Sequence, residues 1–149
     1  MKCVFCKKTN SEKDFIYETK YWRAFLADEQ SNLGRCVIML KRHCEDLAEL
    51  EQKEWLDFSR LVKKLESSLK RAFNATMFNW ACLMNNAYQD NLPKPHVHWH
   101  FRSRYKHKVK FADLIFEDKE FGHHYDSAKK REVSDEVTNK IIEIIKESL

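Results

Sequence analysis

The chain has 149 residues, of which 27 are Lys or Arg and 23 are Asp or Glu, so its formal net charge is +4. This small excess favours an anionic small-molecule ligand and argues against binding to a nucleic acid duplex. No apolar run approaches the roughly 20 residues that span a bilayer, and the N-terminal residues lack the apolar core of a signal peptide. We therefore expect a cytoplasmic protein without membrane contact, whose five cysteines are thiols or metal ligands rather than disulfides.

The first half of the chain predicts three short strands followed by one long helix. Alternating side chains predict strands at 15–18 and 21–28, and the unbroken apolar run at 36–40 predicts a buried strand. We expect one or two helical turns at 45–50. From 51 to 73, apolar residues recur at steps of three and four, which predicts a helix with one buried face. That face is formed by Trp55, Phe58, Val62, Leu65, Leu69 and Phe73.

The second half predicts two more strands and a closing helix. We expect strands at 77–84 and 97–104, separated by a loop at 85–95 that contains both prolines of the chain. Residues 105–131 are mixed in charge and are predicted to be irregular. Ser134 is a suitable N-cap for a C-terminal helix, because acidic residues follow it. The elements add up to an α+β fold: an antiparallel sheet of about five strands with one long helix and a C-terminal helix, in a single domain of 149 residues.

Three histidines alternate with apolar residues in the strand predicted at 97–104. Side chains alternate between the two faces of a strand, so His96, His98 and His100 share one face, with neighbours roughly 6.6 Å apart. The apolar residues that alternate with them share the opposite face, where they can pack against helices. Burying imidazoles costs free energy unless they are paired, so a row of three requires a chemical reason.

Three interpretations of this row compete. The histidines can be surface residues on an exposed sheet face. Histidine is an uncommon residue, however, so three of them in strict alternation rarely arise by chance. They can bind a metal ion, since two histidines in a His-x-His pair on a strand form a chelating pair. They can also supply a nucleophile, because a neutral imidazole attacks phosphorus when its other nitrogen is held by an acceptor.

The segment HVHWHFRSRY, residues 96–105, resembles the motif of the histidine-triad (HIT) family, in which three histidines alternate with apolar residues. The resemblance continues in FLADEQSNLGRCVIMLKRH, residues 25–43, and in the pair of asparagines at 85–86. It covers roughly residues 3–105, which form the core of the expected HIT-like fold, and leaves 106–149 as a C-terminal extension. Membership implies a nucleotide hydrolase or nucleotidyl transferase, and it implies a homodimer.

The resemblance assigns a role to several residues. His98 would be the nucleophile that forms a nucleotidyl-histidine intermediate at the α-phosphate, and His100 would lie near the phosphates and assist proton transfer. Asn85 matches an amide that contacts the nucleotide. Asp28 is the expected nucleotide-binding acid, one residue after Ala27, which stands at the usual position of a ribose-binding acid. No catalytic metal is required. The implied substrates are nucleoside phosphoramidates or dinucleoside polyphosphates, cleaved by water or by another phosphate.

Several residues depart from the family pattern around the phosphates. Arg102 and Ser103 replace an apolar residue and a proline, Arg35 replaces a histidine, and Pro93 stands where many members have Ser or Thr. Two rival functions follow from the pattern. One is a nucleotide-binding sensor without catalysis, and the other is a zinc hydrolase whose metal is held by the three alternating histidines.

Cys3 and Cys6 are separated by two residues, a spacing that suits two ligands of one tetrahedral zinc ion. A redox pair and a chance occurrence are the alternatives. In a zinc-containing branch of the HIT family, the matching positions imply that His43 and His96 complete a closed Cys2His2 site, with Cys44 as an alternative ligand beside His43. A structural zinc ion is therefore the expected cofactor.

Overall fold

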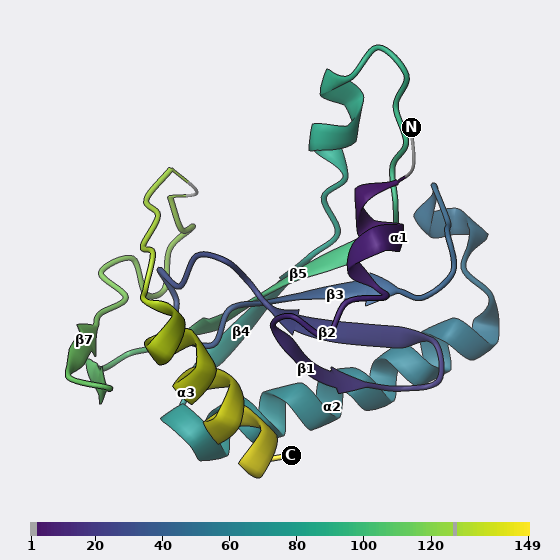
Figure 1. The fold of residues 1–149 in the computed structure, drawn as a ribbon. Coiled ribbons are helices and arrows are strands. Elements are labelled where there is room, and N and C mark those ends of the chain that lie inside the picture. Colours follow the sequence, from purple (N-terminus) through teal and green to yellow (C-terminus); the bar gives the residue numbers. More distant parts are fainter. Residues whose placement is uncertain (1–2, 127) are drawn as a thin grey trace.

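A computed structural model describes residues 3–126 and 128–149 (Figure 1). Its centre is a five-stranded antiparallel sheet in the order β1-β2-β3-β5-β4. The strands are β1 (Phe15–Glu18), β2 (Trp22–Leu26), β3 (Cys36–Leu40), β4 (Met77–Ala81) and β5 (His98–Arg104). The predicted fold class is therefore confirmed, and the strand that carries the histidines lies between two neighbours.

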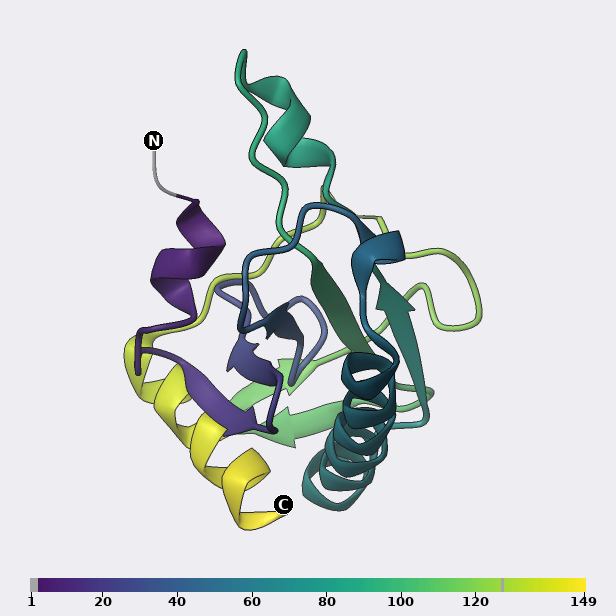
Figure 2. The same cartoon turned by 90° about the vertical axis from the view of Figure 1, so that its right-hand side faces the viewer.

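The long helix α2 (Gln52–Phe73) covers one face of the sheet (Figures 1 and 2). It begins with a capping box between Glu51 and Glu54, and it ends where Asn74 adopts a left-handed conformation with φ of 56°. The predicted apolar face is buried except at Val62, which is half-buried, and at Trp55, which is 37% exposed and meets the ring of Trp99 edge to face.

The C-terminal helix α3 (Asp135–Glu147) is capped by Ser134, whose side chain accepts a hydrogen bond from the amide of Val137. Its buried face contains Ile141 and Ile145, and the hydroxyl of Ser68 in α2 donates to the carbonyl of Ile145 at 2.8 Å. The helix thus packs beside α2 and closes the apolar core, as predicted.

Two short elements lie on the side of the sheet opposite α2, and neither was predicted (Figures 1 and 2). The helix α1 (Val4–Lys8) stands above the sheet near the N-terminus. The 3-10 helix η2 (Asn85–Gln89) opens the segment predicted to be a loop at 85–95, which protrudes from the body of the molecule. A further 3-10 helix, η1 (Leu47–Glu49), matches the turns expected at 45–50.

The prediction of an irregular segment at 105–131 was partly wrong. It contains a two-stranded sheet formed by β6 (Val109–Phe111) and β7 (Leu114–Phe116). The two residues of the connecting turn, Ala112 and Asp113, both adopt positive φ, at 48° and 60°. Within the described part of the chain, none of the helices has the length and apolar character needed to cross a bilayer.

Candidate active site and metal cluster

The side of the sheet opposite α2 carries the histidine side chains of β5. Strand β5 pairs with β3 through His98 opposite Met39 and His100 opposite Val37, and with β4 through Ala81 opposite His100. The rings of His98 and His100 meet edge to face, with their centroids 4.9 Å apart. A central strand paired on both edges holds this pair on a rigid backbone.

His98 is 5% exposed, and its Nδ1 lies 2.7 Å from the carbonyl oxygen of His96. A carbonyl only accepts hydrogen bonds, so Nδ1 carries the proton and Nε2 carries the lone pair. Burial lowers the pKa of His98 below its usual value, and the bond to the His96 carbonyl partly opposes that effect. The side chain is therefore a neutral imidazole whose Nε2 carries a free lone pair.

The imidazole of His98 borders a cavity of about 220 Å³. The cavity is lined by Phe5, Leu83, Met84, Asn85, Asn86, Ala87, His96, His98 and His100. Sites that enclose a whole drug-sized ligand measure roughly 300–1,000 Å³, so this volume suits a phosphate group rather than a complete nucleotide. Asn85, expected from the resemblance to contact the nucleotide, is among the residues that line the cavity. Asp28 does not line it: its side chain is 87% exposed and lies 3.7 Å from the ammonium of Lys8.

His100 differs from His98 in its electrostatic surroundings. Burial, the neighbouring His98 and the positive charge of Arg35 together lower the pKa of His100 to about 4. The His100 imidazole is therefore neutral near pH 7, and it can form hydrogen bonds to phosphoryl oxygens without carrying a positive charge.

The four residues expected to bind zinc lie together. Potential ligand atoms of Cys3, Cys6, His43 and His96 all lie within 4.8 Å of one another. The Nδ1 atom of His96 is 3.5 Å from both sulfur atoms, and the Nδ1 of His43 is 3.4 Å from Cys6 Sγ. A tetrahedral zinc ion with bonds of about 2.3 Å to sulfur and 2.0 Å to nitrogen requires S···N separations of roughly 3.5 Å. The donor set and its spacing therefore fit zinc.

The outer nitrogens of both histidines have acceptors, as metal-bound imidazoles usually do. His96 Nε2 lies 2.8 Å from the carbonyl oxygen of Leu40, and His43 Nε2 lies 3.1 Å from a carboxylate oxygen of Glu45. The alternative ligand Cys44 turns elsewhere, because its thiol donates to the carbonyl of Asp46 at 3.1 Å. Among the described residues, the alternating histidines form no metal-binding group of their own, since His96 belongs to the cysteine cluster.

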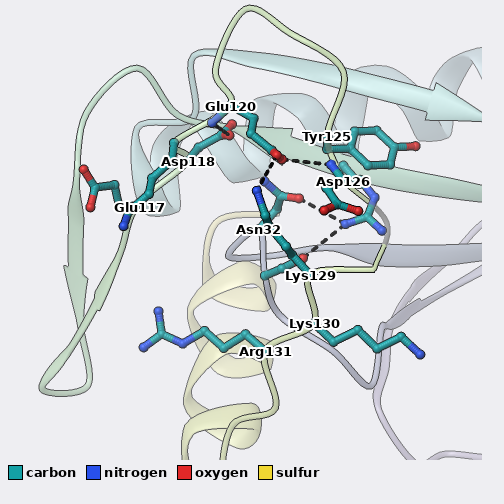
Figure 3. Close-up of a pocket in the computed structure, with 12 residues that line it drawn as sticks. Asn32, Glu117, Asp118, Glu120, Tyr125, Asp126, Lys129, Lys130 and Arg131 are labelled. Atoms are coloured by element: carbon teal, nitrogen blue, oxygen red, sulfur yellow. Dashed lines mark hydrogen bonds and ion pairs between the residues drawn. The ribbon is translucent and has the colours of Figure 1, made fainter.

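A second cavity, of about 450 Å³, lies between the β2–β3 connection and residues 117–120, 125–126 and 129–131 (Figure 3). At its edge Arg102 is 6% exposed, and its guanidinium donates to Asn32 Oδ1 at 3.1 Å and pairs with Glu29 at 3.3 Å. The ring of Tyr125 covers the same guanidinium at 4.2 Å. Sequence reasoning missed these contacts, which attach both the β2–β3 connection and, through Tyr125, the C-terminal segment to β5.

The sequence profile of the HIT domain matches residues 8–107, so this chain belongs to the HIT family. It is 30% identical over 118 residues to an uncharacterized HIT-like protein from Methanocaldococcus jannaschii, a match that covers 75% of this chain and 88% of the relative. Solved structures with the same fold include a hypothetical histidine triad nucleotide-binding protein from Sulfolobus tokodaii, with a TM-score of 0.71, 21% identity and coverage of 98% and 91%. Another is a zinc-bound histidine triad family protein from Mycobacterium smegmatis, with a TM-score of 0.67, 16% identity and coverage of 99% and 93%.

Proposed function

We propose that the chain is a nucleotide hydrolase or nucleotidyl transferase in which His98 attacks the α-phosphate of a nucleotide. One observation carries this proposal: His98 donates Nδ1–H to the His96 carbonyl at 2.7 Å and borders a cavity of phosphate size. The bond fixes the tautomer, and the cavity gives a phosphorus atom a place beside the nucleophile.

In the proposed first step, the Nε2 lone pair of His98 forms a bond to the α-phosphorus. The bond from phosphorus to the leaving group breaks, and its electron pair leaves with that group. An oxygen of a water molecule or of a second phosphate then bonds to the phosphorus as the Nε2–P bond breaks. The electron pair of that bond returns to Nε2, which restores the neutral imidazole, and an attacking water loses its proton to solvent. Asn85 and the neutral His100 donate hydrogen bonds to the phosphoryl oxygens, where charge develops. A polyphosphate departs as an anion without needing a proton, which suits a neutral His100.

We further propose that Cys3, Cys6, His43 and His96 hold a structural zinc ion. All four tetrahedral positions would be filled by protein ligands, so the metal would tie α1 to β5 without taking part in the reaction. The contact of Asp28 with the nucleotide, the homodimer and the cytoplasmic location stay predictions from the sequence. At its exposed position, Asp28 would reach only a ribose that lies outside the cavity.

The test is release of nucleoside monophosphate from adenosine phosphoramidate and from diadenosine polyphosphates. We expect the wild type and His124→Ala to release product, because His124 is exposed and lies outside the cavity. We expect His98→Ala to release none. If the wild type binds nucleotide without turnover, the enzyme proposal fails and the sensor interpretation replaces it. If Cys3→Ser still turns over and a chelator abolishes that turnover, a zinc ion outside the cysteine cluster takes part in the reaction and the zinc hydrolase interpretation is favoured instead.

A further inference from the structure

The ring of Phe5 lies directly against the proposed nucleophile. Its centroid is 4.1 Å from that of His98, and the two planes are inclined by only 23°, which is a stacked arrangement. The same ring lies 5.8 Å from the ring of His96. The contact joins the N-terminal helix α1 to β5, which lie about ninety residues apart in the sequence.

The position of Phe5 depends on the metal cluster. Phe5 stands between Cys3 and Cys6, the two cysteines whose sulfur atoms are each 3.5 Å from His96 Nδ1. The helix α1 has only five residues and none of them is buried, so it has little packing of its own to hold it in place. Isolated helices of this length are unstable in water. Coordination of the two flanking cysteines would therefore restrain the phenyl ring over His98.

The stacked ring complements the hydrogen bond at His98 Nδ1. That bond to the His96 carbonyl restrains one edge of the imidazole, yet it still permits the ring to tilt about the Nδ1–H···O direction. Contact with the flat face of Phe5 opposes this tilt and excludes water from one side of the imidazole. Together the two contacts define the plane of the imidazole and hence the direction of the Nε2 lone pair.

We propose that Phe5 is a positioning residue that holds the imidazole of His98 in its attacking orientation, and that metal binding by Cys3 and Cys6 controls this contact. The inference rests on the proposed function for its catalytic consequence, whereas the stacking itself does not depend on that function. Loss of the planar ring would lower kcat rather than raise KM. The substrate would still bind, but the imidazole of His98 would point toward the phosphorus for a smaller fraction of the time.

The experiment compares Phe5→Leu, Phe5→Tyr and the control Val4→Ala with the wild type, each purified with its bound metal. Leu is apolar but has no flat face, Tyr keeps the ring, and Val4 lies in the same helix and is 74% exposed. Metal content is measured first, to show that the cluster is intact in every variant. Turnover then gives kcat and KM, and diethyl pyrocarbonate followed by peptide mass spectrometry gives the acylation rate of His98.

For Phe5→Leu we expect kcat to fall by roughly threefold to tenfold, the range that an aromatic pair supports, with KM nearly unchanged. Phe5→Tyr should restore kcat, and Val4→Ala should match the wild type. His98 should be acylated faster in Phe5→Leu and in wild type stripped of metal by a chelator. A rise in KM at constant kcat would make Phe5 a substrate contact and overturn the positioning role. An unchanged acylation rate would overturn the stacking contact, and this readout decides the point even if the wild type shows no turnover.

Discussion

The buried ion pair between Arg104 and Asp118 gives the sharpest quantitative prediction for the fold. All five N–H groups of the Arg104 guanidinium donate hydrogen bonds. Two of them reach the Asp118 carboxylate at 2.5 and 3.1 Å, and a third reaches Asn79 Oδ1 at 2.9 Å. The last two reach the backbone carbonyls of Glu120 at 2.6 Å and His123 at 3.0 Å. The side chains of the two ionised partners are only 1% and 5% exposed. This network attaches the C-terminal extension to the end of β5.

Replacing Arg104 with Met would leave the Asp118 carboxylate buried without its partner. We therefore expect the free energy of unfolding to fall by about 3–5 kcal/mol. The matched control is Lys108→Met, which removes a pair with Glu117 that is 3.6 Å long and whose side chains are 64% and 39% exposed. That change should cost at most about 1 kcal/mol. Urea unfolding followed by circular dichroism measures both values. Equal losses of unfolding free energy in the two variants would show that the buried pair is no harder to break than the exposed one.

Two further predictions concern pH and metal. The pKa of His100 falls from 6.5 to about 4 on folding, so the unfolded chain binds more protons in that interval and stability is lost as the pH falls from 6.5 toward 4. Urea unfolding between pH 6.5 and 4 should show that the free energy of unfolding falls less steeply with falling pH in His100→Gln than in the wild type. Identical pH dependence in the two proteins would contradict the low pKa of His100. Inductively coupled plasma mass spectrometry should find one zinc ion per chain in the wild type and less than one in Cys3→Ser. The control Cys82→Ala should keep one zinc ion, because its thiol lies outside the cluster. Zinc retained at full occupancy by Cys3→Ser would exclude the proposed ligand set.

Much of the sheet and the long helix could be predicted because their patterns are local. The predicted limits 15–18 and 36–40 coincide with β1 and β3, and the predicted helix at 51–73 begins one residue before α2. Each of these elements buries one face or both, so the spacing of apolar side chains directly records the contact with the core. The strand predicted at 77–84 is longer than β4, since the pattern does not mark where the pairing with β5 ends.

The elements that were missed have no such local signal. The helix α1 buries no residue, so it has no apolar period to detect. The β6–β7 pair has three residues in each strand, and its turn places Ala112 and Asp113 at positive φ. Two-residue hairpin turns of this kind are usually recognised by Asn-Gly or Asp-Gly, and neither dipeptide is present there. Contacts distant in the sequence stabilise both elements.

The candidate site likewise contains local motifs, which the sequence shows, and contacts between distant segments, which it does not. The histidine row and the cysteine pair are short motifs, and the resemblance to the HIT family added His43, so His98 and the four residues of the cluster could be named as candidates from the sequence. The stacking of Phe5 on His98 and the pairing of Arg102 with Glu29 join segments far apart in the chain. Neither contact has a periodic or fixed-spacing signature in the sequence, because each depends on the tertiary fold that brings the two segments together.

We propose that the reaction passes through a covalent bond between His98 and the nucleotide. The most direct measurement mixes the protein with a diadenosine polyphosphate, quenches the mixture in alkali within the first turnover and locates any adduct by peptide mass spectrometry. We predict an adenylyl group on the peptide that contains His98, and no adduct in His98→Ala. Turnover by the wild type without this adduct, or product release by His98→Ala at the wild-type rate, would contradict the claim.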